Sequence, residues 1–372
     1  MDNTTPRPKR KISQIIWCIV RRTLLTLFTV VILLVIGLWT VCNLIFNGPS
    51  ESAKNVLTMS LLEASATKWI PGLFIGEEGV KNVQSSVTST LPADVSSADQ
   101  VVIQTDINNG AFSSEWEDHP DGIRIEDIKG DTYTAHVMIV RDPSTVFVAT
   151  SLSPGQSFST DIPGKPINYT MMKLDTVAGV NGGAFFDNGT GSPSIGSVPS
   201  GLVISEGKVV WDDKKSYNGF AGFTEDNLLV VAPTMTAQKA KELNIRDGCC
   251  FGPVLIMDGE INETAYNQNS GYNPRTAIGQ RADGAIILLC IDGRQLGSLG
   301  GTYADIINIM VEYGAVNACN LDGGSSSAMF YKDVYGKYGA EDALIMINSY
   351  SLLQETPRRM PTYIMVRPSS EE

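Results

Sequence analysis

The chain has 372 residues and a net charge of −12, with 43% hydrophobic and 18% charged residues, a composition typical of a globular protein rather than a disordered one. Its only histidines are His119 and His136, and neither lies in a motif for a Ser-His-Asp triad or a multi-histidine metal centre. No Walker loop or dinucleotide-binding glycine fingerprint occurs. The chemistry that remains is that of carboxylates, asparagine, arginine and backbone amides.

The N-terminal segment is predicted to anchor the chain in a membrane. Residues 1–22 carry six basic side chains and one acidic one, and no charged residue follows until Glu51. At ~1.5 Å per residue, the apolar stretch within residues 23–47 can cross a ~30 Å hydrocarbon core. The positive-inside rule places residues 1–22 in the cytoplasm as a basic tail and the rest outside the cell membrane. A cleaved signal peptide is the alternative, but its apolar region is shorter, ~7–15 residues.

The part of the chain beyond the tail is strongly acidic. Residues 1–22 contribute +5, which leaves −17 for the remainder. Such a surface repels nucleic acid, so no nucleic-acid partner is expected. Cys290 and Cys319 lie outside the membrane span in strand-like runs, where a disulfide is permitted, and the sequence leaves open whether they are bridged.

Residues 48–121 are predicted to form a stalk helix and a linker. Apolar residues recur at helical spacing from Ala53 to Ile75, and the helix is expected to stop near Pro71-Gly72. The segment Ser85 to Asp99 is rich in Ser, Thr and Ala, as linkers are.

Residues 122–367 are predicted to form the main domain, followed by a C-terminal tail of residues 368–372. Strands are expected at 123–128, 133–140, 146–149, 202–204, 209–211, 228–231, 254–257 and 285–291, and helices at 167–174, 236–243 and 304–313. The order shows no regular alternation of strand and helix, which favours an α+β fold, a mixed β-sheet core with packed helices, over a doubly wound one.

Four segments of this domain share one design, in which polar residues and glycine or proline follow or precede an apolar run. They are Asn181-Gly182-Gly183, Asn273-Pro274-Arg275-Thr276, Asp292-Gly293-Arg294 with the downstream Gly300 to Asp305, and Asp322 to Ser327. Each alone can be an ordinary turn. Because all four can lie at strand ends, together they predict one convergent site.

In this order the four segments resemble the motifs of the phosphodiester glycosidases, a family typified by N-acetylglucosamine-1-phosphodiester α-N-acetylglucosaminidase. The resemblance covers roughly residues 122–367. It implies hydrolysis of the C1–O bond between a sugar and a phosphodiester, with a phosphorylated glycan or sugar-1-phosphodiester as substrate. Relatives of this kind include bacterial exopolysaccharide biosynthesis proteins with an N-terminal anchor.

The candidate catalytic carboxylates are Asp322, Asp292 and Asp305. Glycoside hydrolysis commonly uses a pair of carboxylates, although a phosphate leaving group reduces the need for a general acid. Asp305 stands where we expect Glu in many members of the family, and its side chain is one methylene shorter. The turn reads D-G-G-S-S-S rather than D-G-G-G-S-S, which retains an anion-binding nest.

The candidate substrate-binding residues contact either phosphate or sugar. Arg275 is the expected phosphate ligand because its guanidinium fork matches phosphate oxygens, with a structural ion pair as the alternative. Asn181 is expected to hydrogen-bond sugar hydroxyls or an N-acetyl group. Thr302 is expected to be either a helix N-cap or a substrate contact. The remaining candidates supply backbone N–H groups or hydroxyls, and they are Gly182, Gly183, Gly323, Gly324, Ser325 and Ser326.

The sequence requires no cofactor, and although a divalent cation at the aspartates is compatible with it, no ligand spacing supports one. The leading hypothesis is therefore a membrane-anchored extracytoplasmic phosphodiester glycosidase acting on cell-surface or exported glycans. The alternative from another class is a noncatalytic glycan-binding or assembly factor in exopolysaccharide biosynthesis. A third hypothesis is a carboxylate-metal phosphodiesterase that cuts the P–O bond instead.

Overall fold

The computed structural model describes most of the chain, and every structural statement below concerns the described residues. These are residues 12–62, 67–85, 91, 94–103, 113–186, 195–214, 218–268, 270–295, 297–349 and 356–369. The predicted cytoplasmic tail lies partly outside them, as do parts of the predicted linker and C-terminal tail.

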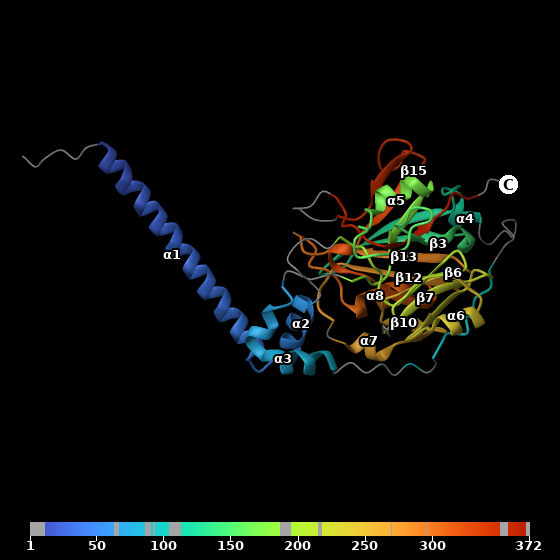
Figure 1. The fold of residues 1–372 in the computed structure, drawn as a ribbon, viewed down its shortest axis with the longest axis horizontal. Helices are drawn as coiled ribbons and strands as arrows, with labels where there is room; N and C mark the ends of the chain where they lie inside the picture. Colours follow the sequence, from blue (N-terminus) through green and yellow to red (C-terminus); the bar gives the residue numbers. More distant parts are fainter. Residues whose placement is uncertain are drawn as a thin grey trace, which may run out of the picture.

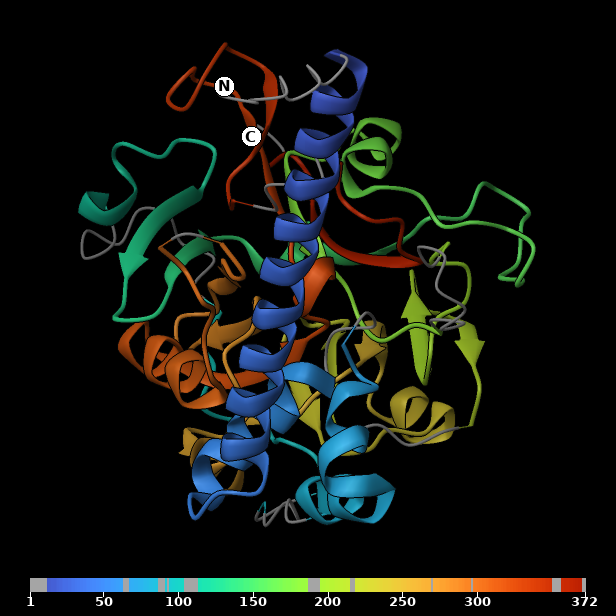
Figure 2. The same ribbon diagram turned by 90° about the vertical axis from the view of Figure 1, so that its left-hand side faces the viewer.

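Three helices form the N-terminal part of the molecule. Helix α1 (Ile12–Phe46) projects away from the body, and α2 (Glu51–Leu62) and α3 (Ile70–Ser85) lie at its C-terminal end, beside the body (Figures 1 and 2). Within α1, the segment Ile19–Phe46 has the length and the apolar composition needed to cross a membrane. The ring of Phe74 on α3 contacts those of Trp39 and Phe46, with centroids 4.7 and 4.9 Å apart, so α3 is joined to the end of α1.

The predicted single helix from Ala53 to Ile75 is wrong in its bounds. Two helices form, and α3 begins at Ile70 and continues past Pro71 and Gly72. The reason is positional, because proline is well tolerated in the first turn of a helix, where its missing N–H has no intrahelical partner. The backbone is instead non-helical at Gly76, whose φ is 69°.

The main domain contains three antiparallel sheets. The largest has seven strands in the order β1 (Ile123–Lys129), β2 (Thr134–Val140), β13 (Ile286–Ile291), β12 (Arg275–Arg281), β14 (Ala315–Leu321), β10 (Val254–Met257) and β11 (Glu260–Ile261). The second has the order β16 (Ala343–Met346), β15 (Met329–Asp333), β4 (Ala178–Asn181), β17 (Thr362–Val366) and β3 (Val146–Thr150). The third has the order β6 (Lys208–Asp212), β5 (Leu202–Ser205), β9 (Ile245–Cys250), β7 (Phe220–Thr224) and β8 (Leu229–Ala232).

The sheets share one central hydrophobic core, with the helices on the outer faces (Figure 1). Helix α8 (Tyr303–Glu312) buries its apolar face on the seven-stranded sheet, beside α7 (Glu263–Asn267), and Trp116 of α4 (Ser113–Trp116) belongs to the same apolar cluster. Helix α5 (Ile167–Leu174) packs on the second sheet and α6 (Ala237–Glu242) on the third. Two short 3₁₀ turns, η1 (Pro143–Thr145) and η2 (Gly324–Ser326), complete the elements.

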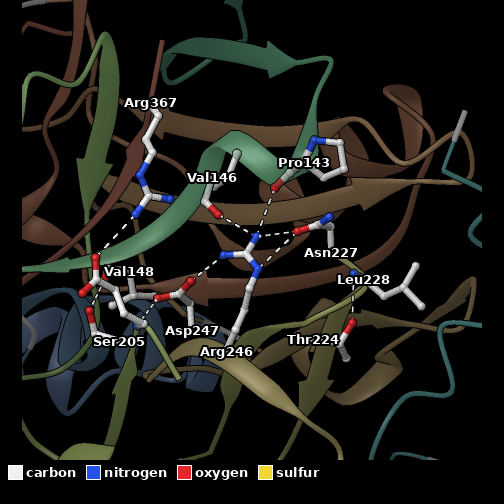
Figure 3. Close-up of polar contacts among 11 residues, drawn as sticks. Pro143, Val146, Val148, Ser205, Thr224, Asn227, Leu228, Arg246, Asp247 and Arg367 are labelled. Carbon is white, nitrogen blue, oxygen red and sulfur yellow. Dashed lines mark hydrogen bonds and ion pairs between the residues drawn. The ribbon is translucent and has the colours of Figure 1, made fainter. Parts of the chain in front are cut away.

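Arg246 connects the third sheet to the second (Figure 3). Its guanidinium donates to the carbonyl oxygens of Pro143 (3.3 Å) and Val146 (2.9 Å), to Oδ1 of Asn227 and to the carboxylate of Asp247. Asp247 is 2% exposed, and burial raises the pKa of its carboxyl despite the opposing hydrogen bonds and the nearby guanidinium. The buried Asp247 carboxylate therefore has the partly buried Arg246 guanidinium as its partner. Removal of either side chain would leave the other without its partner and would destabilise the fold.

The predicted α+β class with one N-terminal apolar helix is confirmed. The cysteines Cys249, Cys250, Cys290 and Cys319 are buried and free. Cys290 and Cys319 lie on the two strands that flank β12, opposite Thr276 and Ile278 respectively. Two strand spacings separate these positions by roughly 9–10 Å, too far for a disulfide.

Candidate active site

Strand order brings three of the four motif segments to one edge of the seven-stranded sheet. Strand β12 lies antiparallel between β13 and β14, so its first residues, Arg275 and Thr276, pair with the last residues of the neighbours, Ile291 and Leu321. Asp292 and Asp322 directly follow those strands. The turn carrying Asp322 and the segment before β12 are also joined by a hydrogen bond of 2.8 Å from Gly324 N to the Pro274 carbonyl.

Asn181, at the end of β4 in the second sheet, joins the fourth segment to the others. Its Oδ1 accepts hydrogen bonds from the Thr276 hydroxyl (2.7 Å) and the Ala328 N–H (3.1 Å), and its Nδ2 donates to the Asp322 carbonyl (2.6 Å). The side chain is 0% exposed. The geometry therefore favours a role in positioning Asp322 over the predicted contact with sugar.

The glycines of the motifs allow close backbone contact. A Cβ on Gly182 would lie 2.6 Å from the Thr362 hydroxyl, and one on Gly183 would lie 2.5 Å from the Cys250 carbonyl. Gly323 is similarly close to the Pro274 carbonyl, and Gly324 has a φ of 63°, a conformation that favours glycine. Close packing of the two segments and the backbone conformation of Gly324 are sufficient reasons for these glycines. Their contact with substrate stays a prediction.

Asp322 stands at the surface of this assembly. It is half-buried, and its Oδ1 accepts a 2.9 Å hydrogen bond from the Gly323 N–H. Its own N–H donates to the Gly182 carbonyl (3.2 Å). The backbone on both sides of the carboxylate is thus fixed, while part of the residue reaches solvent, as a catalytic carboxylate requires.

Several buried polar atoms around the turn have no hydrogen-bond partner among the described residues. They are the hydroxyls of Ser326 and Ser327, Nδ2 of Asn273 and Oδ1 of Asn320. Buried polar groups are normally satisfied by protein, water or ligand. Four such atoms on adjacent segments indicate a place where water or a polar ligand completes the bonding.

Arg275, the predicted phosphate ligand, has its guanidinium bonded to neighbouring loops in the structure. It is 2% exposed, its Nε donates to the Gly301 carbonyl (3.1 Å), and its Nη2 donates to the Ser270 and Gly271 carbonyls (2.8 and 3.1 Å). The guanidinium also lies 4.5 Å from the ring centre of Tyr303. This geometry supports a structural role in which Arg275 fixes the loops around the site through their carbonyls, and its contact with phosphate stays a prediction.

Arg358, which the sequence did not single out, is a basic residue that contacts the Asp322 turn. Its Nη1 donates to the hydroxyl of Ser325 (3.1 Å), and its guanidinium lies 4.8 Å from the ring centre of Phe185. Phe185 belongs to the N-G-G-A-F-F segment after β4, and Ser325 is exposed. No motif surrounds Arg358, so only the fold could place it there.

Arg294 is a second basic residue of the site. It is exposed, adopts a φ of 59°, and donates from Nη2 to Oδ1 of Asn273 (2.8 Å). The contact links the D-G-R segment to the segment that precedes β12.

Asp292 is almost fully buried and coupled to a histidine. It is 4% exposed, and its Oδ1 accepts from the Ser349 N–H (2.9 Å) and lies 3.3 Å from Nε2 of His136. The other ring nitrogen, Nδ1, lies 2.7 Å from the carboxylate of Asp127. Burial lowers the pKa of His136, but Asp292 and then Asp127 raise it more, so the net pKa lies above the ordinary value. His136 thus lies between two carboxylates, those of Asp292 and Asp127.

Asp305 and Thr302 form a capping box at the start of α8. The Thr302 hydroxyl accepts from the Asp305 N–H (3.2 Å), and the Asp305 carboxylate accepts from the Thr302 N–H (2.7 Å). Of the two roles proposed for Thr302, the N-cap is the one present. Asp305 is engaged in the same cap, which is a sufficient reason for a carboxylate at this position.

Among the residues that the structure describes, no group of three or more His, Cys, Asp or Glu side chains could hold a metal ion. A divalent cation at the aspartates stays a prediction.

The model of the phosphodiester glycosidase family matches residues 175–367, which is more than half of the chain and contains all four motif segments. The chain belongs to the phosphodiester glycosidase family. The catalytic domain of zebrafish N-acetylglucosamine-1-phosphodiester alpha-N-acetylglucosaminidase, solved in a form auto-inhibited by its pro-peptide, has a similar fold. The TM-score is 0.50 at 22% identity, over 66% of this chain and 82% of that one.

A curated relative matches a shorter stretch. The SPbeta prophage-derived uncharacterized protein YomE of Bacillus subtilis (strain 168) is 33% identical over 159 residues, 41% of this chain. The matched stretch is only 24% of the length of YomE, so the relationship extends to a domain and not to the whole relative.

Proposed function

We propose that this phosphodiester glycosidase family member hydrolyses the C1–O bond of sugar-1-phosphodiesters in cell-surface or exported glycans, with α1 as its membrane anchor and the domain outside the cell. The observation that carries the proposal is the arrangement around the Asp322 turn, where a half-buried carboxylate and unpartnered buried hydroxyls lie on one short segment and an arginine from a distant loop contacts that segment. A phosphate needs a cation and hydrogen-bond donors, and a glycosidic carbon needs a nearby carboxylate.

Arg358 is the residue that we assign to the phosphate. Stacking on Phe185 restricts its orientation, and its contact with Ser325 aims it at the turn. Its guanidinium and the unpartnered hydroxyls of Ser326 and Ser327 would bind phosphate oxygens as the C1–O bond breaks. This binding favours the phosphate as leaving group, because the negative charge that develops on its oxygen is already paired.

Asp322 is the carboxylate that we assign to the reaction at C1. In the overall step the oxygen of water bonds to C1, the electron pair of the C1–O bond leaves with the phosphate, and the proton of water is taken up by a base. Asp322 can act as that base or stabilise the positive charge at C1. Asp292 is less accessible, and its contacts with His136 and Ser349 suit it to hold the neighbouring backbone in place.

The test is release of reducing sugar by the full-length chain in lipid nanodiscs from a panel of sugar-1-phosphodiesters that includes nucleotide sugars. Asp322→Asn should lower kcat by ~10²-fold or more, since the isosteric amide cannot accept a proton. Arg358→Ala should lower kcat/KM by ~10–100-fold, the range of a lost charge-assisted hydrogen bond. Arg359→Ala is the matched control, because this neighbouring arginine is exposed, and it should behave as wild type.

The same panel distinguishes the alternative function. An assembly factor would bind glycan without turnover, and neither variant would change a measurable rate. Equal losses in Arg358→Ala and Arg359→Ala would instead show that general charge, and not the arginine on Phe185, attracts the substrate.

A further inference from the structure

A hollow away from the motif segments lies between the loop that precedes β1 and the loop that follows β15. Its volume is about 60 Å³, and it opens to solvent. Three tyrosines line it, Tyr331, Tyr335 and Tyr338, together with Asp118, His119 and Lys337. Concave sites with aromatic walls and a few polar groups are the usual form of small-ligand sites.

The loop that carries two of the tyrosines is held rigidly. The carboxylate of Asp333, 0% exposed, accepts hydrogen bonds from the N–H groups of Lys337 (2.8 Å), Tyr338 (2.6 Å) and Gly339 (2.7 Å). Yet Tyr335 and Tyr338 are 55% and 41% exposed. A loop whose backbone is already fixed by a buried carboxylate, and whose rings are exposed, loses little conformational freedom when a ligand binds.

The inner wall of the hollow is also fixed. The hydroxyl of Tyr331 donates to the carboxylate of Asp121 (2.6 Å), and its ring meets that of Tyr338 edge-on at 6.1 Å and 88°. These groups are engaged with one another. Asp118 and His119, at the rim, are the polar side chains placed to bond a ligand.

The charges of the lining select the class of ligand. The lining has two carboxylates, Asp118 and Asp121, and one ammonium, Lys337. An anion such as phosphate is therefore not attracted to it. The Lys337 ammonium already lies 5.6 Å from the ring centre of Tyr338, so a second cation on this ring would be repelled. A neutral sugar fits both limits, since its C–H face packs on a tyrosine ring and its hydroxyls bond carboxylate and imidazole.

The hollow is separate from the candidate active site. Its residues Ile123 and Ile125 pair with Val140 and Met138, which pair with Ile286 and Leu288 of β13, so four to six strand positions separate them from Asp292, which follows the end of β13. At ~3.4 Å per residue the two places lie roughly 15–20 Å apart along the strand direction. We propose that this hollow is a noncatalytic subsite that binds a neutral sugar unit of a glycan chain. The subsite does not depend on the proposed hydrolysis.

The experiment measures binding to the full-length chain in lipid nanodiscs by saturation-transfer NMR. The probes are tetrasaccharides of glucose, of galactose and of N-acetylglucosamine, with choline chloride and inorganic phosphate as competing ligand classes. The variants are Tyr335→Ala and Tyr338→Ala, both at exposed positions. Tyr169→Ala is the matched control, because Tyr169 is 47% exposed and has the Lys165 ammonium 5.5 Å from its ring centre but does not line the hollow.

At least one tetrasaccharide should bind saturably to wild type and to Tyr169→Ala, and ~5-fold or more weakly to each of the other variants, the scale of one lost ring contact. Binding should persist in Asp322→Asn, which separates this subsite from the active site. The proposal is overturned if no tetrasaccharide binds, if the tyrosine variants bind like the control, or if choline or phosphate alone competes for Tyr335 and Tyr338.

Discussion

Replacement of Asn181 tests how the two sheets position Asp322. Asn181→Ala removes three hydrogen bonds at a fully buried position and leaves the Thr276 hydroxyl, the Ala328 N–H and the Asp322 carbonyl short of a partner. A buried polar group left without a partner costs ~1–3 kcal/mol. Three such groups give a loss of roughly 3–9 kcal/mol, or ~6–36 °C in the melting temperature at ~2–4 °C per kcal/mol for a domain this size.

A second substitution at this position separates the contact with Asp322 from the other two. Asn181→Asp keeps the oxygen that accepts from Thr276 and Ala328 but places a second carboxylate oxygen where Nδ2 donated to the Asp322 carbonyl. At neutral pH this variant buries a charge against a carbonyl oxygen, and at low pH its protonated carboxyl can donate there again. Burial raises the pKa of such a carboxyl, so the stability deficit should shrink as the pH falls. The deficit of Asn181→Ala should not.

The assay is thermal unfolding of the full-length chain in nanodiscs between pH 5 and 8, with the rate of sugar release measured in parallel. Asn267→Ala is the control, because that exposed amide bonds within its own helix to Glu263, and it should cost less than ~1 kcal/mol. The reasoning is refuted if Asn181→Ala is as stable as this control, or if the deficit of Asn181→Asp is the same at pH 5 and pH 8.

Three other substitutions test further contacts. Arg246→Met strands the buried Asp247 carboxylate and should cost ~3–5 kcal/mol at neutral pH, with a smaller deficit in acid because burial already raises the pKa of Asp247; an equal deficit at pH 5 and pH 8 in denaturant titrations would contradict this. The raised pKa of His136 adds stability that is complete below its unfolded value of ~6.5 and is lost as the pH rises through the folded value. His136→Asn should therefore flatten the pH dependence of the melting temperature from about pH 6 upward. An unchanged slope would show that other titratable groups cause this dependence. Thr302→Ala removes the cap of α8 and should lower the free energy of unfolding by ~0.5–2 kcal/mol, while kcat/KM stays as in wild type. A raised KM would instead support a contact between Thr302 and the substrate.

The sequence predicts helices and strands correctly where a segment has a clear hydrophobic pattern of its own. The predicted helix at 167–174 has the bounds of α5, and the apolar runs at 123–128 and 254–257 became β1 and β10. Strands β7 and β9 were missed because their sequences, FAGFT and IRDGCC, have weak strand patterns. Their pairing with each other and with β5 and β8 decides their conformation.

The candidate site was predictable to the level of segments but not of side-chain roles. Polar residues beside glycines at strand ends located the Asp322 turn, and the antiparallel order of β12, β13 and β14 then brought the segments together. The burial of Arg275 depends on three carbonyls contributed by other segments, and the position of Arg358 depends on a loop far along the chain. Neither feature leaves a local pattern in the sequence, so the motif alone pointed to Arg275, and only the fold pointed to Arg358.

The measurement that tests the central claim most directly is hydrolysis of a sugar-1-phosphodiester in H₂¹⁸O by the full-length chain, with mass spectrometry of both products. Attack of water on C1 places the label in the released sugar and none in the phosphomonoester, and this is the predicted result. Label in the phosphate product would show cleavage of the P–O bond, and would contradict the assignment of Asp322 to the chemistry at C1.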